Sequence, residues 1–250
     1  MFYTEYGPEG QIDADTNKLL TGMETAHKTG LNAVEFWRWH TRDWKALLAK
    51  KEELGLTLTA ICTKNMGNLD DPEQRNDALS GLKETIEVAK MFQCPNIIVT
   101  AGDNSDIDRA AARKSIVEGL KEMAPLAEAA DVTLVLEPIY GGYFVDSEEP
   151  FGIIGEVGSP KVKLLYDIFH YQQIEGNIVD TIRKNIDKIG HFHAAGVPDR
   201  NEITTGELNY RYILQEIEKT GYQGYVGLEY VPLKEKEASI KEFTELMENL

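Results

Sequence analysis

Four side chains that could bind a metal or move a proton follow one another at regular distances in the carboxyl-terminal half of the sequence. Each lies at or near the end of a short apolar run typical of a buried strand: Glu137 in VTLVLEP, Asp167 in LLYDIFH, His193 in GHFHAAG and Glu229 in YVGLEYV. Successive members are about 30 residues apart, the length of one strand and one helix. A carboxylate at the end of a buried strand loses solvation, which is normally tolerated only when the group is paired, hydrogen-bonded or bound to a metal.

The types of these four side chains indicate a divalent metal site. If their strands are parallel neighbours about 4.8 Å apart, the side chains can meet at one point, where three carboxylates repel one another unless a cation is present. Three oxygen donors and one imidazole favour a single Mg²⁺ or Mn²⁺ ion, with Zn²⁺ or Co²⁺ as substitutes. Each acid alone also fits a helix cap or an ion pair, and a lone strand histidine fits a satisfied core residue. Four strand-end groups in register favour a shared metal.

Two further histidines accompany this set. His170 follows Asp167 in what we expect to be a loop, where it could bind the metal, contact a substrate hydroxyl or orient Asp167; we favour substrate contact. His191 shares a strand face with His193 but lies one layer deeper, which favours a structural role.

The elements that must position these groups alternate along the chain. Short apolar, β-branched runs alternate with longer stretches of helical period, the pattern of parallel strand–helix units. The expected strands are Ala33–Trp37, Thr57–Cys62, Asn96–Ala101, Thr133–Pro138, Val162–Ile168, Gly190–Ala194 and Tyr225–Tyr230, with an eighth at Met1–Tyr6. Helices are expected between them, from Thr16–Lys28 to a final one at Lys234–Asn249, with terminating glycines such as Gly55.

Eight such units predict one α/β domain over residues 1–250, a closed (β/α)₈ TIM barrel. In this fold all strand ends open on one face, where catalytic groups collect. The alternative is an open doubly wound sheet, but its usual signal is missing because no glycine-rich phosphate turn follows the first strand.

The composition disfavours several classes of partner. The 42 acidic and 26 basic residues give a formal charge of −16, which would repel a nucleic acid backbone. No apolar run approaches the ~18 residues of a membrane span, and the amino-terminal residues lack the pattern of a signal peptide. Two cysteines in separate stretches are too few for a disulfide framework or a thiolate metal site. We therefore expect a soluble, cytoplasmic protein with no nucleic acid or membrane partner.

At this point the sequence can be related to a family. The segments LVLEPI, YDIFHYQQIEG, GHFHAAGVPDRNEITTGELNY and GYVGLEY resemble hydroxypyruvate isomerase and its relatives among the xylose isomerase-like TIM barrels, over nearly the whole chain. The resemblance implies that Glu137, Asp167, His193 and Glu229 hold a metal and that the two glutamates also act as acid and base. It implies proton transfer through a metal-bound enediolate, as in the conversion of hydroxypyruvate to tartronate semialdehyde. No glycine-rich phosphate cradle follows the seventh or eighth expected strand, so we expect the substrate to be a small unphosphorylated sugar or keto acid. Homo-oligomers are common in the family.

Arg200, in the loop after the seventh expected strand, matches a family arginine ahead of a turn that here reads TTGELNY. Its planar pair of donors suits a substrate carboxylate or diol, although a surface arginine is the alternative. His193 stands where hydroxypyruvate isomerases commonly have glutamine and ketose epimerases have histidine. Relative to the family the amino terminus looks clipped, because the first strand would begin at Met1.

Other reaction classes on the same scaffold stay open. A ketose 3-epimerase or an inosose dehydratase-like enzyme would begin with the same proton abstraction, and the sequence does not separate them from an isomerase. A barrel retained as a scaffold around a structural metal is a further alternative. Endonuclease IV shares the barrel, but its three-metal site needs several more histidines than the five in this chain, so a nuclease is disfavoured.

Overall fold

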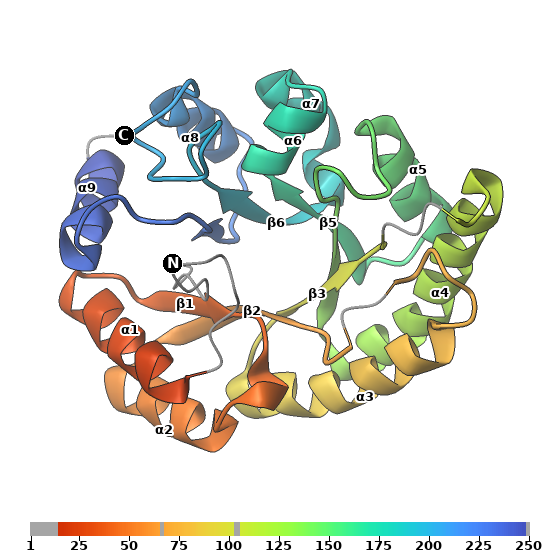
Figure 1. Cartoon of the computed structure of the whole chain (residues 1–250), viewed down its shortest axis with the longest axis horizontal. Helices are drawn as coiled ribbons and strands as arrows, with labels where there is room; N and C mark the ends of the chain where they lie inside the picture. The colour runs from red at the N-terminus through yellow and green to blue at the C-terminus, as the bar shows by residue number, and fades with distance from the viewer. Residues whose placement is uncertain (1–14, 66–67, 103–105, 249–250) are drawn as a thin grey trace.

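The computed structural model describes residues 15–65, 68–102 and 106–248. The described strands form one parallel seven-stranded sheet in sequence order, ringed by helices (Figure 1). They are β1 (Ala33–Phe36), β2 (Thr57–Cys62), β3 (Asn96–Thr100), β4 (Thr133–Glu137), β5 (Val162–Asp167), β6 (Ile189–Ala194) and β7 (Val226–Leu228). This arrangement confirms the predicted TIM barrel. The eighth strand expected at Met1–Tyr6 lies outside the described residues.

The helices alternate with the strands as predicted, and their ends follow local chemistry. They are α1 (Thr16–Lys28), α2 (Trp44–Leu54), α3 (Arg75–Phe92), α4 (Arg109–Ala130), α5 (Glu148–Val157), α6 (Ile168–Ile174), α7 (Ile178–Asn185), α8 (Tyr210–Lys219) and α9 (Lys236–Glu248), with short 3₁₀ turns η1 (Trp39–Thr41) and η2 (Ile186–Lys188). Asp43 caps α2 by accepting a hydrogen bond from the Ala46 amide, and Gly55 ends it at a φ of 63°, which glycine adopts without strain. Within the described ranges, no helix is long and apolar enough to cross a bilayer.

Side chains alternate along each strand between the barrel interior and the surrounding helices. On β4, Leu134 and Leu136 belong to the large cluster shared with the helices, whereas Val135 packs in a smaller cluster of strand residues inside the barrel. The same alternation places Glu137 on the interior face with Val135. The strand ends at Glu137 because Pro138 has no N–H to donate to the ladder.

The register of neighbouring strands brings reactive side chains to one level. Asp167 on β5 pairs with His193 on β6, and His193 pairs with Gly227 on β7. The sheet is curled, because Glu35 on β1 contacts His193 across the interior although β1 and β6 are not neighbours in the sheet. The carboxyl ends of the strands therefore open on one face of the barrel.

Candidate active site at the barrel mouth

The structure brings the four side chains singled out in the sequence together at the carboxyl ends of β4 to β7. Glu137, Asp167, His193 and Glu229 each offer one N or O atom, and these atoms lie within 4.8 Å of one another. All four residues are buried. We call these four residues the mouth cluster.

His193 contacts carboxylates on both sides of its ring. Its Nδ1 atom is 2.8 Å from Glu229 Oε2 and 3.6 Å from Glu137 Oε1, while its Nε2 atom is 3.0 Å from Glu35 Oε2. Burial by itself lowers the pKa of His193, but the carboxylates of Glu137, Glu229 and Glu35 outweigh burial and hold this pKa well above its ordinary value. Surroundings this negative favour a cation at the Nδ1 side of the ring.

The two carboxylate oxygens of Asp167 have different surroundings. Oδ1 caps α6 by accepting hydrogen bonds from the amides of Phe169 (2.8 Å) and His170 (3.4 Å). Oδ2 is buried and accepts no hydrogen bond within the described residues. Burial raises the pKa of Asp167, but the neighbouring His170 and Arg200 side chains outweigh burial and bring the pKa below its ordinary value. This carboxylate is therefore both a helix cap and a candidate metal ligand.

The mouth cluster fits a divalent cation. Like Asp167 Oδ2, Glu229 Oε2 is a buried oxygen without a hydrogen-bond partner in the described part of the chain, and it lies 2.8 Å from His193 Nδ1. Burial raises the pKa of Glu229; Arg200 and His193 oppose this rise and Glu137 adds to it. Buried acceptors with unused lone pairs are costly unless a donor or a cation meets them. Three hard oxygen donors and one imidazole suit Mg²⁺, Mn²⁺ or Zn²⁺.

Arg200 reaches the mouth cluster from the loop after β6. Its Nη2 donates a hydrogen bond to Glu229 Oε1 at 2.6 Å and lies 3.9 Å from Asp167 Oδ2. The guanidinium carbon is 5.1 Å from the centre of the Phe169 ring. The Arg200 backbone has a φ of 57°, which residues other than glycine seldom adopt, and its carbonyl accepts a hydrogen bond from the Val231 amide at 2.8 Å. The structure thus holds this arginine beside two of the candidate ligands.

Glu202, a buried carboxylate in the same loop, ties the loop to the segment after β7. Its oxygens accept hydrogen bonds from the amides of Leu233 (2.9 Å) and Lys234 (3.2 Å) and from Ser239 Oγ (3.0 Å). The loop that carries Arg200 and the segment that follows Glu229 therefore support each other.

His170 lies in the first turn of α6 rather than in the loop expected from the sequence. That expectation was wrong because Asp167 caps a helix that begins at Ile168, so no loop separates β5 from α6. The His170 Nδ1 atom accepts a hydrogen bond from the Tyr140 amide at 3.2 Å, and Nε2 lies 3.4 Å from Asp167 Oδ2. The buried ring therefore connects the segment after β4 to a candidate ligand.

A pocket of about 320 Å³ opens beside Glu137. Asn68 and the aromatic side chains Tyr140, Tyr143 and Phe144, from the segment after β4, contribute to its walls. Tyr140 is about half exposed, so its ring is available to a bound molecule. Glu137 is thus a mouth-cluster carboxylate that faces open space.

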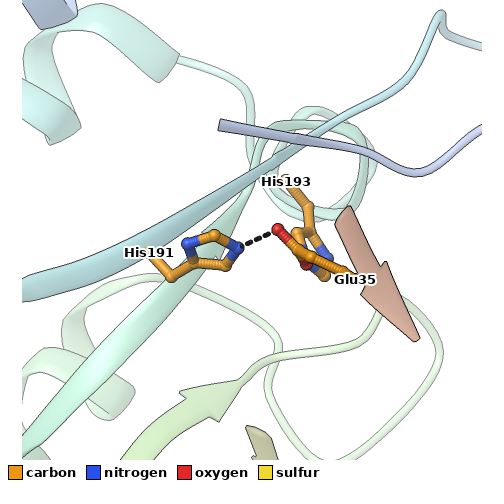
Figure 2. A group of neighbouring side chains, drawn as sticks. All are labelled: Glu35, His191 and His193. Carbon is orange, nitrogen blue, oxygen red and sulfur yellow. Dashed lines mark hydrogen bonds and ion pairs between the residues drawn. The ribbon is translucent and has the colours of Figure 1, made fainter. Parts of the chain in front are cut away.

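Glu35 is a buried carboxylate that the sequence analysis did not single out. It lies in the apolar run AVEF on β1 and contacts both His191 and His193 (Figure 2). Burial raises the pKa of Glu35, but His191 and His193 outweigh burial and hold the pKa well below its ordinary value. The sequence did contain a signal, because an acid within an apolar strand raises the same question of partners as Asp167 does.

Comparisons with known proteins agree with this geometry. Residues 23–250 match the model of the family described as xylose isomerase-like TIM barrel. Hydroxypyruvate isomerase from Escherichia coli (strain K12) is 36% identical over 236 residues, covering 89% of this chain and 91% of that protein. The 2-oxo-tetronate isomerase of Cupriavidus necator is 34% identical over 227 residues, covering 85% of this chain and 87% of that protein.

The fold is also shared with solved structures of lower identity. The crystal structure of an AP endonuclease, family 2, from Brucella melitensis has a TM-score of 0.88 at 23% identity and covers 98% of this chain and 96% of that chain. The two sequence relatives named above are isomerases, which confirms the prediction that this chain is an isomerase. The family match spans both the mouth cluster and the strands that position it, and the chain belongs to the xylose isomerase-like TIM barrel family.

Proposed function

We propose that this isomerase interconverts a small α-hydroxy carbonyl compound and its isomer by proton transfer between adjacent carbons, with hydroxypyruvate and tartronate semialdehyde as the favoured pair. The observation that carries the proposal is the position of two carboxylates, Glu137 and Glu229, 3.6 Å and 2.8 Å from the Nδ1 atom of His193. The names of the two sequence relatives, a hydroxypyruvate isomerase and a 2-oxo-tetronate isomerase, support a keto-acid substrate.

The proposal includes one divalent cation at the mouth cluster. Glu137, Asp167, His193 and Glu229 would hold it, and their three oxygen donors favour Mg²⁺ or Mn²⁺. A bound divalent cation would act as a Lewis acid towards the substrate carbonyl and stabilise the negative charge that develops beside it.

Glu137 and Glu229 are the proposed acid and base. Glu137 lines the pocket and can meet the substrate directly. Glu229 is fixed by Arg200, and burial raises its pKa, which brings a carboxylate closer to the pH at which it can accept and return a proton. One carboxylate would take the proton from C3 of hydroxypyruvate and one would deliver a proton to C2, while a further proton passes from the C3 oxygen to the C2 oxygen.

Arg200 and His170 are the proposed substrate contacts. Both are buried or half-buried beside Asp167, close to the candidate ligands that would hold the cation and, through it, the substrate. The volume of about 320 Å³ is at the low end of the range for ligand sites, which suits a small sugar or keto acid. The guanidinium of Arg200 offers the planar pair of donors that a carboxylate accepts.

A ketose 3-epimerase is the second candidate. The observation that favours it is His193 itself, because the family resemblance associates histidine at this position with ketose epimerases. In that reaction the proton would return to the carbon from which it came, on the opposite face. A dehydratase of the inosose dehydratase type begins with the same abstraction and ends with loss of water.

The test is proton NMR in D₂O with metal-free protein, to which Mg²⁺ is added, against hydroxypyruvate and a panel of small ketoses. We expect Mg²⁺-dependent uptake of deuterium from solvent and formation of tartronate semialdehyde from hydroxypyruvate. Glu137→Gln and Glu229→Gln should each slow exchange about 10²–10⁴-fold, the range of general acid–base catalysis. Glu216→Gln is the matched control, since this α8 carboxylate pairs with Arg183 and Lys219 away from the mouth; its exchange rate should equal that of the unmodified protein.

The product separates the candidates. Exchange with inversion of a ketose would replace the isomerase proposal by the epimerase, and release of water would replace it by the dehydratase. Absence of exchange with every substrate, from protein shown to contain its cation, would refute the proposal for that panel and favour a structural metal.

We also propose a cytoplasmic location and a homo-oligomeric assembly for this isomerase. Cys62 and Cys94 are both buried thiols, which suits a reducing compartment. Cell fractionation with an antibody to the chain and light scattering of the purified protein would test these two points.

A further inference from the structure

Glu35 lies behind His193, on the side of the ring that faces away from the mouth. Its Oε1 atom is 2.8 Å from His191 Nε2 and accepts a hydrogen bond from Thr59 Oγ1 at 2.6 Å, and its Oε2 atom is 3.0 Å from His193 Nε2. Figure 2 shows the His191 ring directed at the Glu35 carboxylate with the His193 ring beside it. The carboxylate is buried and brings together side chains from β1, β2 and β6.

The chemistry of these contacts fixes where the protons are. An ionised carboxylate only accepts hydrogen bonds, so each of its three partners must present a hydrogen to it. His193 must then carry a proton on Nε2, so that when the ring is neutral, as a metal ligand must be, its lone pair is on Nδ1. That Nδ1 atom is the one directed at Glu137 and Glu229 in the mouth cluster.

The same atoms could in principle bind a second metal, because Glu35, His191 and His193 also offer ligand atoms close together. Two observations disfavour this alternative. Thr59 already donates a hydrogen to Glu35 Oε1, and the backbone of β7 closes on the group so tightly that a Cβ atom on Gly227 would lie 2.8 Å from both Glu35 Oε1 and His193 Cδ2. The group is packed as a hydrogen-bonded unit.

We propose that Glu35 is a positioning residue for the mouth cluster: it selects the Nε2–H tautomer of His193 and thereby presents the Nδ1 lone pair to the divalent cation. This inference rests on the proposed function, because it assumes that the mouth cluster binds a cation. A carboxylate that accepts a hydrogen bond from the second nitrogen of a metal-bound histidine fixes the orientation of the ring and makes it a better ligand.

Glu35→Gln is the informative substitution because glutamine has nearly the same shape as glutamate but carries an NH₂ donor in place of one acceptor oxygen. The amide has one acceptor oxygen in place of two, so its NH₂ must face either His193 or the pair His191 and Thr59. Where the NH₂ faces His193, the ring has to accept on Nε2 and carries its proton on Nδ1, directed at the cation. We expect the affinity for Mn²⁺ to fall about 10–100-fold, the usual effect of losing such a partner.

The experiment is calorimetric titration of metal-free protein with Mn²⁺, for the unmodified chain, Glu35→Gln, His193→Ala and the double variant. If Glu35 acts through His193, Glu35→Gln weakens binding in the unmodified background and changes it less than about threefold in the His193→Ala background. Thr59→Val is the matched control, since it removes one donor to Glu35 but leaves the Glu35 contact to His193; its Mn²⁺ affinity should change less than about threefold. Nitrogen-15 NMR of the histidine rings with Mg²⁺ should show His193 protonated on Nε2.

Each other outcome overturns the inference. Unchanged Mn²⁺ affinity in Glu35→Gln, an equal loss in Thr59→Val, or a proton on Nδ1 of His193 with Mg²⁺ present would each refute it while leaving the proposed function intact. Two equivalents of Mn²⁺ per chain, reduced to one by Glu35→Gln, would make Glu35 a ligand of a second site instead. Failure of the unmodified protein to bind Mn²⁺ or Mg²⁺ would remove the proposed function and this inference together.

Discussion

The mouth cluster and the group behind it contain the same kinds of side chain but differ in how many hydrogen-bond donors meet their carboxylates. The group behind it consists of Glu35, Thr59 and His191, which we call the interior cluster. The carboxylate of the interior cluster meets three side-chain partners: Thr59 and His191 within the cluster, and His193 of the mouth cluster. In the mouth cluster three carboxylates surround one imidazole, with Arg200 beside two of them, and two buried oxygens there lack hydrogen-bond partners in the described residues.

The difference lies in the balance of donors and acceptors rather than in burial. All of these side chains are buried or nearly so, and a buried acid is stable when donors match its lone pairs. The Nδ1 atom of His191 has no hydrogen-bond partner in the described residues, but the Glu35 carboxylate meets that condition with protein groups alone. The mouth cluster does not, which is expected of a site that is completed by a ligand. If the mouth cluster binds a cation, a count of donors would separate its acids from the structural acid of the interior cluster.

The largest effect that tests this comparison should come from Glu35→Ala. The change leaves His191 Nε2, His193 Nε2 and the Thr59 hydroxyl without their buried acceptor, which costs about 3–5 kcal/mol of the free energy of unfolding. Urea unfolding of metal-free protein measures it as a lower midpoint with an unchanged slope. Glu237→Ala, which removes an exposed partner of Lys28, should leave the midpoint where it is; an equally small shift for Glu35→Ala would show that the interior cluster is not structural.

Addition of a divalent cation should have the next largest effect. Mg²⁺ or Mn²⁺ at 100 times its dissociation constant should raise the free energy of unfolding by about 2.7 kcal/mol, because it binds the folded chain only. Asp167→Asn should abolish this gain, since the amide is a poor ligand, yet keep the cap on α6, because its Oδ1 atom still accepts from the Phe169 amide.

Thermal unfolding with and without Mg²⁺ gives both results. A cation-free melting temperature of Asp167→Asn far below that of the unmodified protein would show that the charge of Asp167 is needed for the fold itself. A Mg²⁺-induced rise that survives Asp167→Asn would place the cation elsewhere.

Gly227→Ala should disturb the contact between the two clusters. The added Cβ would lie 2.8 Å from Glu35 Oε1 and from His193 Cδ2, and neither buried group can move freely, so overpacking should cost about 1–3 kcal/mol. Gly152→Ala is the control: its Cβ would meet nothing within 4 Å, and alanine within α5 should stabilise by about 0.5–1 kcal/mol. Equal midpoints for the two variants would mean that the packing around His193 is loose.

Local patterns were enough to predict most of the fold. The alternation of apolar runs with helical periods placed every described strand within two residues at each end; the largest difference is at β7, which begins one residue later and ends two residues earlier than Tyr225–Tyr230. Gly55 ends α2 in a left-handed conformation as expected. The sequence separation of the strand-end groups predicted which side chains the barrel brings together, because each strand–helix unit returns the chain to the same face. Their roles as ligands, acid and base stay predictions.

The interior cluster was missed because its partners are far apart in the chain. Glu35 lies 156 residues from His191 and 158 from His193, and no spacing rule connects a strand near the start of the barrel to one near its end. The apolar run LLYDIFH predicted a strand that continues to Ile168 with a loop after it, whereas Asp167 caps α6, which begins at Ile168. Both cases show that a buried acid can have more than one kind of partner, which only the packed structure displays.

The smallest effect should also be the one that best separates the two clusters. A glutamate-to-glutamine substitution should lower the free energy of unfolding in the interior cluster and raise it in the mouth cluster. Glu35→Gln replaces a satisfied acceptor by a mismatched amide and should destabilise the metal-free chain by about 1–3 kcal/mol. Glu137→Gln removes one of the crowded charges at the mouth, and Glu229 and Glu35 still face His193, so it should stabilise the metal-free chain by about 0.5–1 kcal/mol, as is usual where function requires repulsion. Urea unfolding midpoints of Glu35→Gln, Glu137→Gln and the unmodified protein, measured side by side without metal, test this difference in sign. A loss of stability in Glu137→Gln as large as that in Glu35→Gln would mean that the mouth carboxylates are already satisfied by the protein, and that no cation is needed to complete them.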